Sequence, residues 1–385
     1  MTYLLPLLGF CAGLYLYLTM PNTLKPRRNT ARVVQLGVDR HLPRESRVSR
    51  ANVSIIIPAR NEEVNLQKNL PTWMTLAAKL PRHIAEVMVV DDHSEDRTTE
   101  VAAACGARTI ATEDLPEGWY GKPHALMTGS TKAFGSWLLM VDADVSIEVD
   151  PFAEWLQTAI RHERYYSIQP YHQVLSWFEQ ASALPGAVSV LAMHAGSAPP
   201  RTHGGFGPFV LCPKKIYQHV SGHSDIRSKI LENFYLAMRV GKASHIVNLL
   251  GRGYVRYRMY SSLSSLWQGW TKSLAVGATA ENGVRGWLTV VWIAGLLSCW
   301  PLLFAHLLQS PLETLLLYVA QALLMQLVLR RIGSFWSLNS ILFPLSALLF
   351  LILFLSSVWR VKILHSVQWK GRTMHPTKTS EEKSK

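Results

Sequence analysis

Short apolar runs alternate with amphipathic stretches between residues 51 and 255. The runs Val53–Ile57, Val87–Val90 and Trp137–Val141 have the length and composition of buried strands. A shorter strand and three helices are expected between and beside them, at Thr109–Ala111, Asn61–Ala78, Ser94–Cys105 and His124–Phe134. Strands that alternate with helices form a mostly parallel sheet covered by helices. The pattern therefore predicts an α/β domain over residues 51–255.

Polar residues follow each of the three longer predicted strands, in the segments Pro58–Glu62, Asp91–Ser94 and Asp142–Asp144. In such sheets, ligands bind at the carboxyl ends of the strands. Because alternate residues of a strand point to the same side, Asp142 and Asp144 can aim at one point. Two carboxylates there suit Mg²⁺ or Mn²⁺ held with the help of substrate phosphates. An isolated pair of acids is also common at solvated strand ends, so the pair alone decides little.

Long apolar segments lie at both ends of the chain. Tyr3–Met20 predicts a transmembrane anchor over residues 1–20, because it has neither the basic start nor the cleavage site of a signal peptide. Three further segments of near-spanning length predict a transmembrane region over residues 287–358: Trp287–Leu308, Leu312–Leu329 and Ile341–Val358. Basic residues flank the last segment on both sides and Pro344 interrupts it, so it either spans the bilayer or enters and returns.

The net charge of +13 favours an anionic membrane surface over nucleic acid, because the basic residues concentrate beside the apolar segments. A basic linker over residues 21–50 places the α/β domain in the cytoplasm by the positive-inside rule. Residues 256–286 mix Trp with Arg and Lys, which is typical of an amphipathic segment in the headgroup layer, and residues 359–385 form a basic tail. A multi-pass protein of the cell membrane is therefore expected.

Two sets of motifs resemble known enzymes. Ile56–Glu63, Val89–Thr98 and Val141–Asp144 resemble the nucleotide-sugar half of family 2 glycosyltransferases, which have a GT-A fold. A second set resembles one branch of that family, the 4,4'-diaponeurosporenoate glycosyltransferases of staphyloxanthin-type carotenoid biosynthesis: Gly118–Ala125, Ser167–His172, Phe206–Pro208, Arg258–Tyr260, Gln268–Lys272 and Gln368–Arg372. The order of the motifs carries the resemblance, which covers nearly the whole chain from residue 51.

The resemblance implies a site for a UDP-sugar donor. The residues that would line the uridine pocket are Pro58, Arg60 and Glu62, and Asp91 or Asp92 would accept a hydrogen bond from the uracil or the ribose. Lys122, expected in a loop after Gly121, would approach the diphosphate as a point charge. The alternatives are a solvated lysine at position 122 and a carboxylate at position 62 that only stabilises a helix dipole. Asp96 and Thr98 are expected at the start of a helix.

Asp142 and Asp144 would hold a divalent cation between the two phosphates, and Asp144 would thereby act in catalysis. The cation would neutralise charge that builds on the departing nucleoside diphosphate.

An inverting transfer also needs a base, which family members take from an acidic pair after a Gly-His step. Here Gly222-His223 precedes Glu232, and Asn233 stands at the second acidic position. The apolar residues Ile226, Ile230, Phe234 and Met238 predict one helix with Glu232 on another face. Glu232 is therefore the candidate base, with an exposed helix glutamate as the alternative. A carboxylate acceptor would need little help from a base.

The remaining candidate residues would contact the acceptor or the diphosphate. Phe206 and Gly207 would shape the acceptor entrance, since glycine permits close approach. Gln268, Trp270 and Lys272 would cap the diphosphate and the acceptor pocket, and an interfacial helix with a belt of Trp is the alternative.

The resemblance predicts a membrane-bound, inverting hexosyltransferase that moves a hexose from a UDP-sugar to a lipid-soluble acceptor. Glucose and the carboxylate of a C30 carotenoid acid are the expected substrates, with a glycosyl ester as the product. A different lipid acceptor, such as a hopanoid, a sphingolipid or diacylglycerol, is the nearest alternative. A catalytically inert nucleotide-sugar-binding protein is disfavoured by the intact pair of Asp142 and Asp144. A processive polysaccharide synthase is disfavoured because it would carry more membrane helices.

Overall fold

The computed structural model describes residues 3–24, 52–197, 204–280, 283–306, 309–363, 367–369 and 372–374. Most of the predicted linker at 21–50 and of the predicted tail at 359–385 lies outside these residues. Contacts divide the chain into two compact units. The α/β unit comprises Asn22–Pro170 and Gly196–Tyr257, and the helical unit comprises Met1–Pro21, Tyr171–Ala195 and Arg258–Lys385. The sequence pattern had not separated Tyr171–Ala195 from the residues around it.

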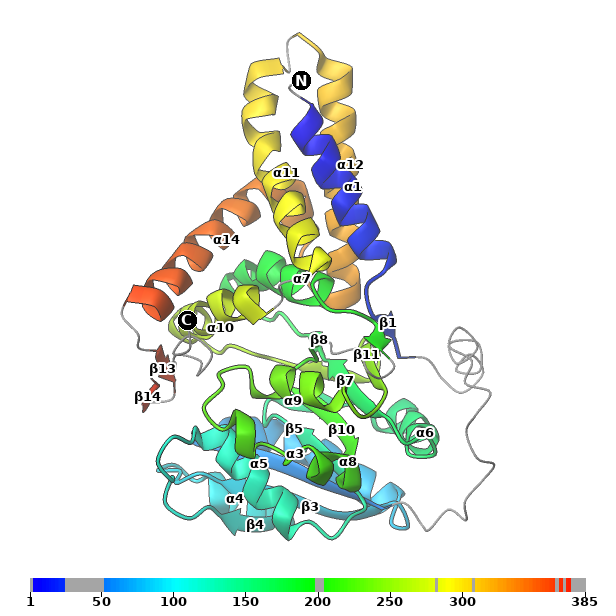
Figure 1. Ribbon diagram of the computed structural model, residues 1–385, viewed down its shortest axis with the longest axis vertical. Coiled ribbons are helices and arrows are strands. Elements are labelled where there is room, and N and C mark those ends of the chain that lie inside the picture. The colour runs from blue at the N-terminus through cyan, green and yellow to red at the C-terminus, as the bar shows by residue number, and fades with distance from the viewer. Residues whose placement is uncertain are drawn as a thin grey trace. The chain divides into compact units, whose positions relative to one another are not determined.

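A mixed sheet forms the centre of the α/β unit, with strand order β1-β11-β7-β10-β5-β2-β3-β4 (Figure 1). Strands β5, β2, β3 and β4 are neighbours in that order and run parallel to one another. Strand β10 is antiparallel to both of its neighbours, β5 and β7. The sheet is therefore less uniformly parallel than the alternating pattern predicts. The bounds are β1 Asn22–Thr23, β2 Val53–Ala59, β3 Ile84–Asp91, β4 Arg108–Ala111, β5 Trp137–Val141, β7 Tyr165–Gln169, β9 Gly196–Ser197, β10 Phe209–Pro213 and β11 Ile246–Leu250. Outside this sheet, β6 (Val145–Ile147) pairs with β12 (Val255–Tyr257).

Helices cover both faces of this sheet because its strands are buried on both sides. Helix α3 (Glu63–Lys79) buries Leu66, Leu70, Trp73 and Leu76 along one stripe, and Trp73 packs against Phe209 of β10. Helix α5 (Gly121–Lys132) lies against the opposite face, in the core cluster that contains Ile56 and Val210. The other helices of the unit are α4 Thr98–Ala104, α6 Val149–Ala159, α8 Lys214–His219, the short 3₁₀ turn η3 Ser224–Ile226 and α9 Glu232–Val240.

Four predicted helix starts differ from the structure. The helix expected from Asn61 begins two residues later, at Glu63. The helix expected from Ser94 begins at Thr98, because the Asp96 carboxylate accepts hydrogen bonds from the backbone N–H groups of Thr98 and Glu63 and so holds the preceding loop open. This agrees with the expected place of Asp96 at a helix start. The helix expected from His124 begins at Gly121, so Lys122 lies in its first turn and not in a loop. The helix predicted by the stripe from Ile226 begins only at Glu232.

Within the described residues, the helical unit contains three stretches that are long and apolar enough to cross a membrane: Val284–Leu302, Pro311–Ile332 and Phe343–Val361. The N-terminal helix α1 (Leu4–Leu18) has 15 residues, or about 22 Å, which is shorter than the predicted span. The remaining elements are β8 Tyr171–His172, η2 Trp177–Ser182, α7 Ala183–Leu191, α10 Leu263–Ala280, α11 Val284–His306, α12 Pro311–Ile332, α13 Leu338–Ile341, α14 Phe343–Val358, η4 Trp359–Ile363, β13 Val367–Trp369 and β14 Arg372–Met374.

Helix α1 packs closely against α11 in this unit (Figure 1). A Cβ atom added to Gly9 would lie 2.5 Å from Cα of Gly295, so only glycine permits this approach of the two backbones. The buried Arg285 donates hydrogen bonds to the Leu191 carbonyl at 2.7 Å and to Thr19 Oγ1 at 2.8 Å. Arg285 thus ties the ends of α1 and α7 together at the start of α11.

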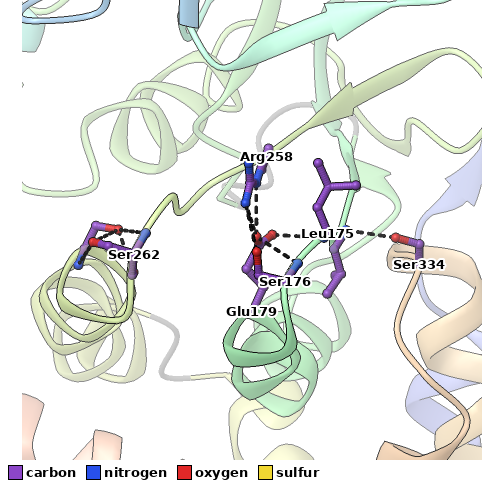
Figure 2. Close-up of polar contacts among 8 residues, drawn as sticks. Leu175, Ser176, Glu179, Arg258, Ser262 and Ser334 are labelled. Carbon is purple, nitrogen blue, oxygen red and sulfur yellow. Dashed lines mark hydrogen bonds and ion pairs between the residues drawn. The ribbon is translucent and has the colours of Figure 1, made fainter. Parts of the chain in front are cut away.

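An ion pair between the half-buried Arg258 and the buried Glu179 orders the segment around η2 in the helical unit (Figure 2). Glu179 has no exposed surface, and its carboxylate accepts hydrogen bonds from Arg258 Nη2 at 2.6 Å and from Ser176 N at 3.2 Å. The Ser176 side chain completes a capping box at the start of η2. Arg258, from one of the motifs that the sequence singled out, therefore holds the turn that contains Ser176 and Glu179.

Candidate active site

The parallel strands of the α/β unit bring the predicted site segments to one edge of the sheet. Ala59 at the end of β2 lies opposite Asp91 at the end of β3, and Ile56 of β2 lies opposite Met140 of β5. The segments that follow these strands therefore start side by side. This arrangement agrees with the edge that the sequence predicts for the site.

Two neighbouring elements hold the loop that carries Asp142 and Asp144. The Asp142 N–H donates to the Pro208 carbonyl at 3.0 Å. From helix α3, Asn69 Nδ2 donates to the Ala143 carbonyl at 2.9 Å, and Trp73 Nε1 donates to the Val145 carbonyl at 3.0 Å. The backbone on both sides of the two carboxylates is therefore fixed by hydrogen bonds from outside the strand.

Lys122 joins two predicted site residues. Its Nζ atom lies 2.6 Å from Asp142 Oδ1 and 2.9 Å from Glu232 Oε1. Glu232 is only 7 % exposed, so it is not an exposed helix glutamate, and Lys122 is not simply solvated. Burial opposes the charge of Lys122, but the two carboxylates outweigh it and raise the pKa of the ammonium group above its usual value.

Negative charge exceeds positive charge in this cluster. Burial raises the pKa of the Asp142 carboxyl, the Lys122 ammonium opposes that rise, and the charges of Glu232 and Glu62 add to it. A divalent cation would relieve this excess. Among the described residues no group of three or more His, Cys, Asp or Glu side chains could hold a metal ion. Carboxylate oxygens fit Mg²⁺ or Mn²⁺, which proteins often hold through one or two carboxylates together with substrate phosphates.

The predicted uridine pocket surrounds the ends of β2 and β3. Arg60 Nη1 donates to the Asp92 carbonyl at 2.9 Å, which links the two strand-end loops. Asp91 Oδ2 accepts a hydrogen bond from Ser94 N, whereas the buried Oδ1 has no partner in the described part of the chain. Glu62 lies just before α3 and accepts a hydrogen bond from Asn65 Nδ2 at 2.7 Å. Pro58 is the penultimate residue of β2. These positions are compatible with both interpretations of Glu62.

The loop of Phe206, Gly207 and Pro208 connects the base candidate to the metal candidates. Asn233 Nδ2 donates to the Gly207 carbonyl at 2.6 Å, and the next carbonyl, that of Pro208, accepts from Asp142 N. Phe206 is buried, and a Cβ atom on Gly207 would meet no protein atom within 4 Å. The space beside Gly207 is therefore open, as an entrance for a ligand would require.

The structure does not place the last three candidates beside this cluster, because they belong to the helical unit. Gln268, Trp270 and Lys272 lie on α10. Trp270 is buried, donates from Nε1 to Ser182 Oγ at 2.9 Å and packs edge-on against Tyr260. Gln268 Nε2 donates to Ser264 Oγ at 3.2 Å. Their contact with donor or acceptor stays a prediction.

Sequence reasoning missed several residues that support the site. Asn69 and Trp73 contact the site from α3. Of the two, only Trp73 belongs to the apolar stripe of the helix, so only its burial could have been predicted from the sequence. Burial raises the pKa of the Tyr257 phenol, the charge of Asp144 adds to the rise, and its hydroxyl accepts from Gln169 Nε2 at 2.7 Å. His223 was noted only as part of the Gly-His step, although it is fully buried beside Asn233.

Comparison with known proteins identifies the class of this fold and site. Residues 54–209 match the model of the glycosyl transferase family 2. The fold resembles that of a mannosyltransferase from Pyrobaculum calidifontis solved in complex with GDP-Man and Mn²⁺, with a TM-score of 0.52, 14 % identity, and coverage of 93 % of this chain and 96 % of that one. The fold is therefore that of a GT-A glycosyltransferase.

Two curated relatives are similar over most of the chain. The 4,4'-diaponeurosporenoate glycosyltransferase of Staphylococcus haemolyticus is 30 % identical over 338 residues, which cover 83 % of this chain and 88 % of the relative. The enzyme of the same name from Staphylococcus aureus (strain USA300) is 31 % identical over 334 residues, with coverage of 83 % and 87 %. The chain belongs to glycosyl transferase family 2, and it is a glycosyltransferase.

Proposed function

We propose that this enzyme is a membrane-bound, inverting glycosyltransferase that moves glucose from UDP-glucose to the carboxylate of a C30 carotenoid acid, with a glycosyl ester as the product. The observation that carries the proposal is the similarity, over 83 % of the chain, to enzymes named for 4,4'-diaponeurosporenoate. The cluster of Lys122, Asp142 and Glu232 supports the proposal, because it brings together the residues proposed to contact the diphosphate, the cation and the acceptor.

The donor would bind along the edge of the sheet. Asp91 Oδ1 has a free acceptor site for the uracil or the ribose, and Arg60 holds the neighbouring loop in place. Pro58, Glu62 and Asp92 would complete the uridine pocket. Lys122 reaches the same cluster and would contact the diphosphate as a positive charge.

Asp142 and Asp144 would hold Mg²⁺ or Mn²⁺ together with the two phosphates of the donor. When bound, the cation supplies positive charge against the negative charge of the departing nucleoside diphosphate. The hydrogen bonds that Pro208, Asn69 and Trp73 make with the surrounding backbone would keep the two carboxylates in place during the reaction.

Glu232 would face the acceptor, and Lys122 Nζ lies 2.9 Å from its Oε1. With a hydroxyl acceptor, Glu232 would remove the proton. With a carboxylate acceptor, which is ionised at neutral pH, it would chiefly orient the attacking oxygen. Phe206 and Gly207 would shape the entrance, where the space beside Gly207 is open, and Gln268, Trp270 and Lys272 would contact the acceptor or the diphosphate.

Membrane association would bring the enzyme to a lipid-soluble acceptor. Three helices of spanning length support it, and the basic residues after residue 24 support a cytoplasmic α/β unit. The acceptor would then enter from the bilayer and present only its polar end to the sugar.

Labelled nucleotide sugars test the proposal. Membranes that contain the full chain are incubated with a C30 carotenoid acid and, separately, with UDP-glucose, UDP-galactose and GDP-mannose, each labelled in the sugar. The proposal predicts a labelled, solvent-extractable product that requires UDP-glucose and the carotenoid acid. A product formed without the carotenoid acid, on a hopanoid, a sphingolipid or diacylglycerol, would assign a different lipid. Absence of any labelled lipid would contradict the proposed transfer.

A further inference from the structure

A buried chain of hydrogen bonds runs behind Glu232 in the α/β unit. The Tyr217 hydroxyl lies 2.8 Å from His223 Nδ1, and His223 Nε2 lies 3.2 Å from Asn233 Oδ1. Asn233 Nδ2 then donates to the Gly207 carbonyl at 2.6 Å. Tyr217, His223 and Asn233 are at most 2 % exposed. The three buried side chains therefore connect α8 to the half-buried loop beside the site.

The amide of Asn233 fixes the direction of every bond in this chain. Because its Nδ2 donates to Gly207, its Oδ1 must accept from His223, which places the imidazole proton on Nε2. Nδ1 of His223 is then an acceptor for the Tyr217 hydroxyl. Burial lowers the pKa of His223 to about 4, and the charge of Lys122 acts in the same direction, while Glu232 and the bond to Asn233 oppose it. The ring is therefore neutral at pH 7.

An acid at position 233 could not make these contacts. An aspartate would place a carboxylate oxygen against the Gly207 carbonyl oxygen, where Asn233 now donates. Asn233 follows Glu232 directly, and the Gly207 carbonyl precedes the Pro208 carbonyl that holds Asp142 N. The same chain thus reaches the backbone at both the base candidate and the metal candidate.

We propose that Tyr217, His223 and Asn233 are positioning residues that hold Glu232 and Asp142 at the separation needed for glycosyl transfer. The inference rests on the proposed function. Asn233 in place of a second acid is then a requirement of this hydrogen-bond chain, independent of whether the acceptor is a carboxylate or an alcohol.

The isosteric variant Asn233→Asp tests the proposal through kinetics. It removes the donor to Gly207, so we expect kcat to fall roughly ten- to hundredfold while the KM for the nucleotide sugar changes less than about threefold. Tyr217→Phe should lower kcat in the same direction, and the double variant should lose less than the product of the two single effects, because both changes interrupt one chain. Gln218→Ala, an exposed neighbour of Tyr217 on α8, is the control that should change neither value.

Stability against pH gives a second readout that does not need activity. In the wild type the folded state binds no proton at His223 until about pH 4, so stability is lost as the pH falls through the unfolded value near 6.5. A carboxylate at position 233 would raise the pKa of His223, so the decrease in melting temperature between pH 7 and pH 5 should be smaller in Asn233→Asp. The proposal would be overturned by an unchanged pH dependence of the melting temperature in Asn233→Asp together with one of two kinetic results. The first is an unchanged kcat in the single variants, and the second is a loss in the double variant equal to the product of the two single losses. Absence of transfer in the wild type would instead contradict the proposed function.

A second, independent observation concerns the helical unit. The segment before and within η2 is bonded to the segment that joins α12 and α14, and Figure 2 shows one of these bonds at Ser334. Hydrogen bonds link the two segments at both ends: Ser334 N to the His172 carbonyl at 2.9 Å, Val174 N to Ser334 Oγ at 2.8 Å, Trp336 N to Gln180 Oε1 at 3.0 Å and Asn339 Nδ2 to Gln180 Oε1 at 2.6 Å.

Large apolar side chains are exposed on these two segments. Leu175 and Trp177 are 70 % and 72 % exposed, and Trp336 and Leu338 are 54 % and 51 % exposed. The segment of Trp336 joins two helices of spanning length, so it lies at the membrane surface if those helices span. We infer that these four residues form a contact surface for the headgroup layer of the bilayer, where Trp is favoured. This inference rests on the proposed membrane association.

A fluorescent label at Trp177 tests this surface. In the full chain with Cys11 and Cys105 replaced by Ser, Trp177→Cys carries an environment-sensitive dye in nanodiscs with or without brominated phosphatidylcholine. The matched control is Val64→Cys, at an exposed apolar position on α3. The inference predicts blue-shifted emission and bromine quenching at position 177 only. Equal emission at the two positions would overturn it, whereas a chain that does not enter nanodiscs at all would contradict membrane association itself.

Discussion

At the scale of single residues, the candidate site is defined mainly by its charged side chains, Lys122, Asp142 and Glu232. The sequence could predict Asp142 and Asp144, because their position depends only on where a buried strand ends. It could not predict that Lys122 pairs with both Asp142 and Glu232, because these ion pairs join residues far apart in the chain. Nor did it predict Asn69, which has an ordinary place on an amphipathic helix and contacts the site only through the tertiary packing of α3.

Asp144→Asn tests the metal assignment at this scale. The change keeps the shape of the side chain and removes its charge, so we expect the rate of transfer to fall on the order of a hundredfold or more. The affinity for Mn²⁺, measured by titration calorimetry on the full chain, should fall as well. Asp150→Asn is the control, because Asp150 is an exposed acid paired with Lys79 outside the site. Full activity of Asp144→Asn in the presence of a chelator would contradict a metal at this position.

Glu232→Gln distinguishes a general base from an orienting group. For a carboxylate acceptor we expect a loss of less than about tenfold, because no proton must be removed. For an alcohol analogue of the same acceptor, the loss should reach about a hundredfold or more. The two acceptors are compared under identical donor and metal concentrations. Equal losses for both acceptors would show that proton removal is not the role of Glu232.

At the scale of elements, the strands were easier to predict than the ends of the helices. Strand β5 matches its predicted bounds of Trp137–Val141, because a fully buried apolar run permits few alternatives. The start of α4 is set by hydrogen bonds that the Asp96 carboxylate accepts from the N–H groups of Thr98 and of Glu63 in another helix, which no local pattern shows. The antiparallel direction of β10 depends on a chain crossing that the periodicity of the strand cannot reveal.

Gly9→Leu tests the packing of α1 against α11. Even a Cβ atom at position 9 would overlap the backbone of Gly295, so the larger side chain must separate the helices. We expect a loss of about 1–3 kcal/mol in stability, seen as a lower unfolding midpoint of the detergent-solubilised protein. Leu8→Ile, at an exposed position of the same helix, should leave the midpoint unchanged. An equal midpoint for both variants would contradict the close contact of α1 and α11.

At the scale of the whole molecule, the sequence correctly predicted the class of the fold and three apolar segments near the C-terminus. It did not show that Tyr171–Ala195 belongs with the C-terminal helices, because the contacts that join them, such as Trp336 N to Gln180 Oε1, link residues far apart in the chain. The N-terminal segment was also predicted to be longer than α1, because hydropathy does not show where a helix ends.

Protease accessibility tests the orientation of the molecule in the membrane. From the basic residues that follow residue 24, we expect residues 53–254 to face the cytoplasm. Protease added to inverted membrane vesicles should therefore digest this region, and protease added to intact spheroplasts should not. The opposite pattern would show that this region faces away from the cytoplasm, and it would not contradict the proposed transfer reaction.

The linkage in the product tests the central claim most directly. The full chain is incubated with a divalent cation, UDP-glucose labelled in the sugar and a C30 carotenoid acid, and the extracted lipid is treated with mild alkali. A glycosyl ester should release the labelled glucose and regenerate the carotenoid acid, and the untreated product should have the anomeric configuration opposite to that of the donor. A labelled lipid that survives alkali, or one that retains the donor's configuration, would contradict ester formation by an inverting transfer.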